Sequence, residues 1–164
     1  MSYVYSQPID RNFLSKDNFR AVFSDFPHME YFIQSFEFPG VTVPAVEQPS
    51  YLKKIDVHGS LIEYDDLSIT FAINETLSNY REIYNWLIKT GTPQKLEEFQ
   101  TPDDLNYCTL MLTSNNKNTI IKVRFDKIFP TALSSFTMDT TSEHNIVTAT
   151  ATFKFNTMTF DENI

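Results

Sequence analysis

Glycine and cysteine are scarce in this sequence, which holds three glycines and one cysteine, Cys108, among 164 residues. A phosphate-binding loop needs several glycines close together, so the chain can hardly build one. The single cysteine excludes an internal disulfide and fits a reducing compartment. The low glycine content also argues against low-complexity and collagen-like structure.

Long apolar runs are missing as well. No stretch approaches the length of a membrane span, and the first ten residues, MSYVYSQPID, lack the charged and apolar regions of a signal peptide. We therefore expect a protein that is made in a cytosol and has no stable association with a membrane.

Basic residues are outnumbered by acidic ones. The sequence has 13 Lys and Arg against 21 Asp and Glu, for a formal net charge of −8. Tight binding to nucleic acid depends mainly on Lys and Arg that displace counterions from the phosphates. This charge balance therefore predicts no tight binding to DNA or RNA.

Aromatic residues are abundant, with 15 Phe and 8 Tyr, and this composition is typical of a sheet protein. The length fits a single domain, residues 1–164, with a proper core. Residues 1–17 show no clear period, and we interpret them as an N-terminal arm.

The most regular stretch, residues 67–93, predicts a strand that leads into a helix. Apolar and polar residues alternate from Leu67 to Asn74, as in a strand with one buried face. Apolar residues then recur at helical spacing, which predicts a helix over Asn79–Lys89 with Ser78 or Asn79 as its cap. Gly91 and Pro93 mark its end. A helix this short is stable only when it packs against a sheet.

Four further segments pair naturally as antiparallel hairpins. Residues 18–26 and 31–38 alternate on either side of a turn at Pro27, so we expect them to pair with each other. Residues 107–113 should pair with 119–125 across a polar turn.

The remaining strands lie near the C-terminus. The segment 128–138 contains Pro130, where we expect the chain to change sheets, and residues 147–155 alternate most clearly, with threonines on the face opposite the apolar one. Seven or eight strands and one helix predict a mainly β fold, an antiparallel β-sandwich or barrel with one short α-helix.

The segment 40–60 is apolar but contains regularly spaced prolines, which exclude a central strand. It is either a loop that folds back over the core or an exposed partner surface. Its apolar residues are Val41, Val43, Val46, Tyr51, Leu52, Ile55 and Val57.

Catalytic and metal-binding patterns are weak. His28, His58 and His144 have no partner at the spacing of a metal site. Asp65 and Asp66 are adjacent, so their side chains diverge and do not form an acid–base pair. Glu143 beside His144 is best explained as a surface loop. We therefore expect no enzyme, no metal and no cofactor.

The order of features resembles the tail tube protein family of contractile-tailed bacteriophages. The resemblance rests on the buried strand, the Asn-Glu corner at Asn74, the Asn-Tyr-Arg opening at Asn79, the Trp-Leu helix end and the upstream segment FPGVTVPAVEQPSYLKKIDVHGSLIEYDDL. It covers about residues 18–160 and is shared with the baseplate proteins that start the tube.

The resemblance implies a tail-tube-like fold and a structural virion protein. Its subunits would form hexameric rings, stacked as the inner tube, with the 40–60 hairpin reaching the adjacent ring. The implied partners are further copies of the chain, the tail sheath, the baseplate tube initiator, the tail terminator protein and the tape measure protein. The virion would assemble in the host cytoplasm.

DNA would pass through an acidic channel without specific binding, because nothing along it would offer phosphate a counter-charge. The acidic candidates for the channel wall are Glu63, Asp65, Asp66, Glu97, Glu98, Asp103 and Asp104.

Two alternatives remain open at this point. The nearer is a tube-initiating baseplate ring with the same fold. The other is a monomeric β-sandwich that binds a carbohydrate or receptor through exposed aromatics such as Tyr51 and Trp86, although Trp86 on a packed helix fits a core or interface position better.

Overall fold

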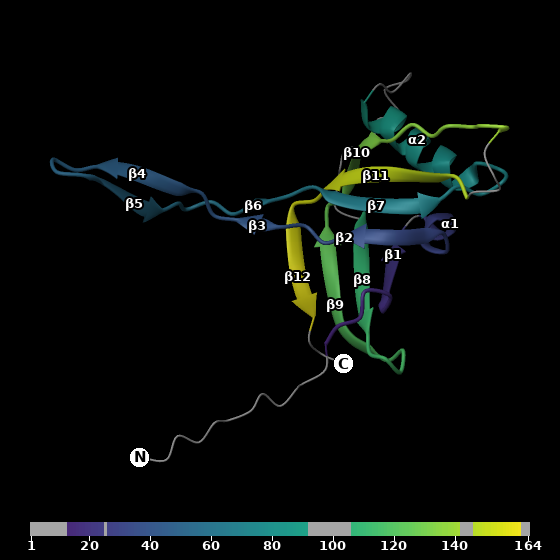
Figure 1. The fold of residues 1–164 in the computed structure, drawn as a ribbon, viewed down its shortest axis with the longest axis horizontal. Coiled ribbons are helices and arrows are strands. Elements are labelled where there is room, and N and C mark those ends of the chain that lie inside the picture. Colours follow the sequence, from purple (N-terminus) through teal and green to yellow (C-terminus); the bar gives the residue numbers. More distant parts are fainter. Residues whose placement is uncertain (1–12, 25, 92–105, 142–145, 162–164) are drawn as a thin grey trace, which may run out of the picture.

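Two four-stranded antiparallel sheets form the body of the protein. The computed structural model describes residues 13–24, 26–91, 106–141 and 146–161. The first sheet has the order β1 (Phe19–Phe23), β8 (Tyr107–Thr113), β9 (Thr119–Asp126) and β12 (Thr157–Asp161). The second has the order β10 (Phe129–Leu133), β11 (Thr148–Lys154), β7 (Leu67–Ala72) and β2 (Ile33–Glu37). Figure 1 shows the strands of one sheet running across those of the other.

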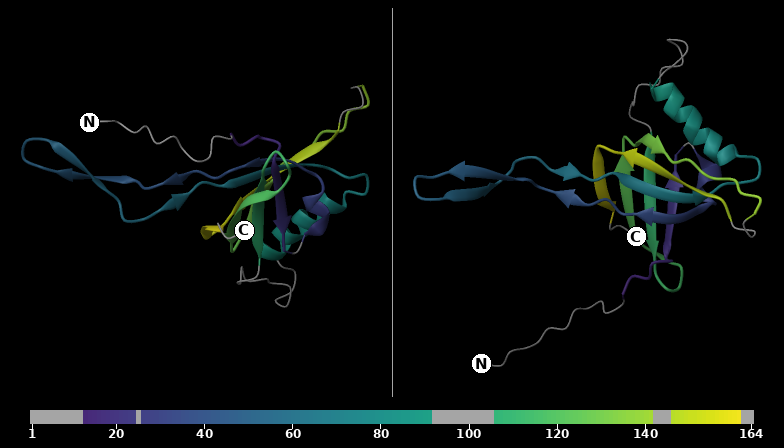
Figure 2. Two further views of the ribbon diagram at one scale, coloured as in Figure 1. Left: turned by 90° about the horizontal axis from the view of Figure 1, so that it is seen from below. Right: turned by 45° about the horizontal axis from the view of Figure 1, so that its top comes forward.

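The remaining strands build a hairpin that projects from the body. Its base is the pair β3 (Val41–Thr42) and β6 (Glu63–Tyr64), and its outer part is the pair β4 (Ala45–Pro49) and β5 (Lys54–His58). Figures 1 and 2 show this hairpin, residues 41–64, extending well beyond the two sheets. The alternative that the segment folds back over its own core is therefore wrong.

The core lies between the two sheets and is rich in aromatic side chains. Leu67, Ile69 and Phe71 of β7 are fully buried, as are Phe125 of β9 and Phe153 of β11. The predicted strand at residue 67 is thus confirmed, as is the mainly β sandwich with a short helix. The described residues also contain a four-residue helix, α1 (Pro27–Glu30), that the sequence did not indicate.

The predicted pairing of residues 18–26 with 31–38 is wrong. β1 lies in the first sheet, where Phe23 is opposite Cys108 of β8, whereas β2 lies in the second sheet beside β7. Helix α1 separates the two strands and turns the chain from one layer to the other. The alternation in β1 does give the strand a buried face, since Ala21 and Phe23 are buried.

β8 pairs with β9 across the turn at residues 114–118, as predicted. The chain changes sheets between β9 and β10, not at Pro130, which lies within β10, and the strand predicted over 128–138 ends at Leu133. In β11 the alternation places Ala149, Ala151 and Phe153 in the core. On its opposite face Thr150 lies beside Thr70 of β7, with the hydroxyl oxygens 3.1 Å apart. β12 was not predicted.

The predicted helix is α2 (Ser78–Gly91), which packs along β10 (Figure 1). Its cap differs from the prediction for Ser78, because Asn74 Oδ1 accepts the Ser78 N–H at 2.8 Å. Asn79 does accept a first-turn N–H, that of Tyr80, at 2.9 Å. Asn79 also donates from Nδ2 to the Ala72 carbonyl at 2.8 Å and is fully buried. It therefore ties the helix start to the end of β7.

Asn79→Ala should lower the free energy of unfolding by about 1–3 kcal/mol, because it leaves the Ala72 carbonyl and the Tyr80 N–H buried without this partner. Urea unfolding followed by far-UV circular dichroism measures the change. Asn116→Ala, on the exposed β8–β9 turn, is the matched control and should change stability by less than about 0.5 kcal/mol. Equal stability of both variants would contradict this role of Asn79.

No helix in the described part of the chain is long and apolar enough to cross a membrane.

Candidate interaction surfaces

The hairpin exposes every apolar residue that the sequence singled out for ring stacking. Tyr51 and Leu52 stand at its tip, 101% and 90% exposed, and the other five are between 39% and 57% exposed. The turn at the tip is closed by a hydrogen bond from the Ser50 N–H to the Lys53 carbonyl at 3.2 Å. Exposed apolar surface of this extent is typical of sites that bind a partner.

The outer part of the hairpin has two different faces. Residues directly opposite each other in an antiparallel pair point to the same side. Val46 is opposite Val57, and Gln48 is opposite Ile55, so these residues form one largely apolar face.

The other face of the outer hairpin is charged. Glu47 lies opposite Asp56, and the Lys54 ammonium contacts the Glu47 carboxylate at 2.6 Å. Within the described residues Asp56 has no ion-pair partner. Like charges opposite each other favour water on that side. The hairpin is therefore a two-stranded ribbon with an apolar face and a solvated face.

Gly59 sets the shape of the hairpin where its inner and outer parts meet. Its N–H donates to the Pro44 carbonyl at 2.9 Å, and a Cβ at this position would overlap that same carbonyl oxygen. Only glycine allows the two sides of the hairpin to approach this closely without distortion.

Gly59→Ala should therefore push the two sides of the hairpin apart at this point and destabilise the pairing of the hairpin by about 1–3 kcal/mol. We expect amide hydrogen exchange in β4 and β5 to become faster by about tenfold or more, with no change in the two sheets. Gly91→Ala is the matched control, because open space surrounds that position at the end of α2. Unchanged exchange in Gly59→Ala would show that the close approach is not required.

The acidic residues proposed for a channel wall are only partly described. Glu63 lies on β6, and Asp65 and Asp66 follow it at the base of the hairpin. The Lys154 ammonium is 3.6 Å from the Asp66 carboxylate. Glu97, Glu98, Asp103 and Asp104 lie outside the described residues, as do Glu143 and His144. The assignment of any of them to a channel remains a prediction.

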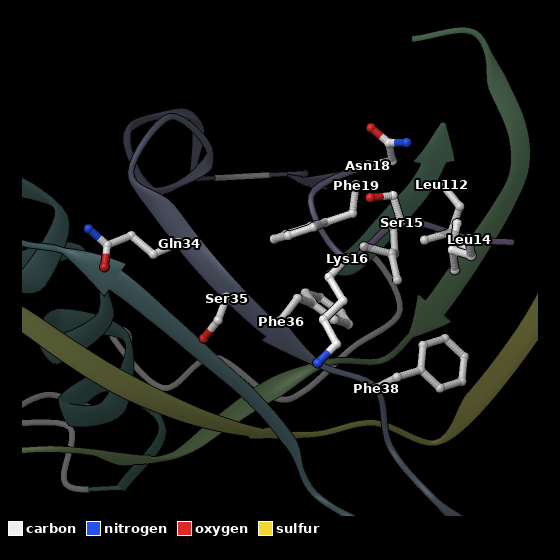
Figure 3. Close-up of a pocket in the computed structure, with 11 residues that line it drawn as sticks. Leu14, Ser15, Lys16, Asn18, Phe19, Gln34, Ser35, Phe36, Phe38 and Leu112 are labelled. Carbon is white, nitrogen blue, oxygen red and sulfur yellow. The ribbon is translucent and has the colours of Figure 1, made fainter. Parts of the chain in front are cut away.

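A groove that the sequence did not indicate opens between β1, β8 and β2. It measures about 720 Å³. Its apolar lining comes from Leu14, Phe19, Phe36, Phe38, Leu110 and Leu112. Figure 3 labels all of these side chains except Leu110 and shows Lys16 reaching across the mouth of the groove. Lys16 is the one charged residue among its described lining residues.

The groove exists because the second sheet covers only part of the first. Cys108 and Leu110 of β8 are 0% and 2% exposed, whereas Leu112, one step further along the same face, is half-buried. Phe38, which also lines the groove, is 44% exposed, and Phe160 of β12, whose ring centroid is 6.3 Å from that of Phe38, is 55% exposed. Alternating apolar residues were visible in each strand, but only the crossing of the sheets leaves their ends uncovered.

The other residues considered as candidate sites do not form a reactive or binding site in the described part of the chain. Burial raises the pKa of the Cys108 thiol well above its usual range, so the thiol is unreactive in the folded protein. Trp86 is 5% exposed and stacks on Phe26 with ring centroids 4.6 Å apart, so it is not one of the exposed aromatics that a glycan-binding surface would use. No cluster of metal-binding side chains occurs among the described residues.

The fold is that of contractile tail and injection-system tubes. The tube-terminating cap of the anti-feeding prophage superposes with a TM-score of 0.71 over 99% of this chain and 100% of that one, at 13% identity. A chain of the extended sheath–tube complex of the PVC extracellular contractile injection system superposes with a TM-score of 0.69. The match covers 93% of this chain and 94% of that one, at 14% identity. A chain of the sheath/tube terminator structure of the PVC system superposes with a TM-score of 0.64, over 98% of this chain and 99% of that one, at 14% identity.

The sequence comparison leads to the same group. The tail tube terminator protein of Enterobacteria phage T4 is 26% identical over 129 residues, which are 74% of this chain and 73% of that protein. No family model matches the chain. The resemblance to tail tube proteins drawn from the sequence is thus confirmed: the chain has a tail-tube-like fold and is similar to a tail tube terminator.

Proposed function

We propose that this protein is a ring-forming subunit of the inner tube of a contractile tail, and that its ring ends the tube. The observation that carries the ring is the hairpin, because its exposed apolar residues have no cover in the described part of the chain. The role is structural and requires neither catalysis nor a cofactor.

Ring formation has a physical reason in the sheets. Among the described strands, β1 and β12 are the edges of the first sheet, and β10 and β2 are the edges of the second. An open sheet edge presents unpaired N–H and C=O groups. In a closed ring a sheet edge of each copy can lie against the next copy all the way round, so that no copy stands at an end. We propose six copies per ring.

The sequence relative supports the place that we propose for the ring. The sequence alone favours the repeated subunit of the tube, stacked ring on ring. The 26% identity to a tail tube terminator supports instead a single ring that closes the tube. Of the partners proposed from the sequence, the sheath and the tape measure protein are kept. The last ring of the tube replaces the stacked copies, the baseplate initiator and the separate terminator.

Charge fits a channel that DNA passes without being held. The net charge of −8 gives phosphate no general attraction. Glu63, Asp65 and Asp66, at the base of the hairpin, are the described candidates for the channel wall.

Removal of the gene from the producing strain tests the place in the tail. A terminator predicts tubes of irregular length, and immunogold labelling of complete particles should mark one end of the tube. Absence of tubes, with label along their whole length, would instead identify the repeated subunit. Label at the baseplate would identify the initiator. Complete particles without any copy of the chain would refute a structural role in the tail.

A further inference from the structure

We propose that the outer hairpin of one copy, residues 45–58, fills the groove of a second copy by lying along the free edge of β2. This inference rests on the proposed function, because it requires that copies of the chain assemble. It assigns a receiving surface to the exposed hairpin and an occupant to the groove.

The hairpin needs a surface to rest on. A two-stranded ribbon by itself is marginally stable in water. The ribbon of β4 and β5 has an apolar face of Val46, Ile55 and Val57, while Glu47 and Asp56 keep its other face in water. A ribbon of this kind is completed when its apolar face covers apolar surface and its charged face stays outside.

The groove needs a cover of the same shape. Within the described residues β2 pairs only with β7, so its other edge offers free backbone groups along one side of the groove. Beneath that edge lie Phe19, Phe38 and Leu112, where the second sheet stops short. A strand added beside β2 would extend the second sheet over these side chains, which is the geometry of β-strand addition.

The chain's own hairpin does not provide this cover. Figures 1 and 2 show the hairpin leaving the body from the end of β2 and pointing away from it in every view. The chain's own hairpin therefore does not lie on its own groove. A neighbour offers a ribbon of the required kind and is present in any assembly of copies.

Charge is complementary as well. Lys16 stands at the mouth of the groove, and neither Lys16 nor Asp56 has an ion-pair partner among the described residues. Glu47 is already paired with Lys54, so Asp56 is the acidic group of the ribbon that Lys16 would meet. The long stem of Lys16 allows its ammonium to reach the rim of a docked ribbon.

Disulfide trapping tests the contact directly, since the native Cys108 is buried and unreactive. Leu14→Cys in the groove is mixed with Val46→Cys, Ile55→Cys or Val57→Cys in a second, tagged copy. The mixture is assembled and then oxidised. A disulfide needs Cα atoms within about 7 Å, so only a close contact reacts. We expect a tagged–untagged dimer with at least one of the three variants. Asp56→Cys, on the opposite face, is the matched control and should give none.

A second measurement does not depend on an exact register. Phe38→Glu should raise the concentration needed for assembly by about tenfold or more, because it places a charge in the groove. Thr76→Glu, which adds the same charge at the exposed corner before α2, should leave assembly unchanged.

The outcomes separate this inference from the proposed function. Rings that form without cross-links and tolerate Phe38→Glu would overturn the inference while the tail assignment stands. Preferential cross-linking through Asp56→Cys, or a chain that remains monomeric, would also overturn it. The proposed function fails on different grounds, namely absence of the chain from particles.

Discussion

Replacing residues 45–58 by Asn-Gly is expected to abolish assembly and leave the body folded. Pro44 and Gly59 are already joined by a backbone hydrogen bond of 2.9 Å, so a two-residue turn can connect them without disturbing β3, β6 or the two sheets. The variant removes the whole apolar ribbon and both tip residues, Tyr51 and Leu52, which are almost fully exposed in a single copy.

The expected effect is large because each of these side chains gains from burial. Full burial of one such side chain is worth about 1.5–3 kcal/mol. If two of them become buried per contact, the loss is about 3 kcal/mol, or roughly a hundredfold in the association constant. Analytical ultracentrifugation over a concentration series measures it. The unchanged sheets are checked by thermal unfolding. A variant that assembles as readily as the native chain would show that the hairpin is dispensable, as a monomeric binding module would predict.

Phe153→Ala is expected to lower the free energy of unfolding by about 3–5 kcal/mol, the usual cost of removing a buried ring from a core. The Phe153 side chain is fully buried on β11. Its ring centroid lies 5.6 Å from that of Phe23 on β1 and 6.0 Å from that of Trp86 on α2. It therefore joins both sheets and the helix, and the cavity left behind touches all three.

Chemical denaturation at equilibrium measures this loss. Phe13→Ala is the matched control, because that ring is 95% exposed and its removal should cost less than about 0.5 kcal/mol. If Phe153→Ala unfolded at the same denaturant concentration as the unchanged protein, the contact between the two sheets would not limit stability.

Local periodicity was enough to predict most elements of the body. The alternation in residues 67–72 and 148–154 gave the two central strands of the second sheet with their inward faces. β12 was missed although Met158 and Phe160 alternate with Thr157, Thr159 and Asp161, because the strand is short and follows directly after a longer one.

Partner choice was not predictable from the same signal. Alternation in β1 shows that Phe19, Ala21 and Phe23 share a face, but it does not say which strand lies alongside. Proximity in sequence favoured β2, whereas the chain crosses through α1 to the other layer. The groove was invisible for a related reason: β1, β2 and β8 each supply part of it, and it depends on how far one sheet covers the other.

The hairpin and the groove are different surfaces on one subunit, and this has a consequence for symmetry. They allow a head-to-tail contact, in which each copy gives its hairpin to one neighbour and receives a hairpin from another. Copies joined head to tail either close a ring or continue as an open filament. A closed circle of them has a fixed sense of rotation, so its upper and lower sides are not interchangeable. A tube built from such rings is therefore polar, and its two ends present different surfaces.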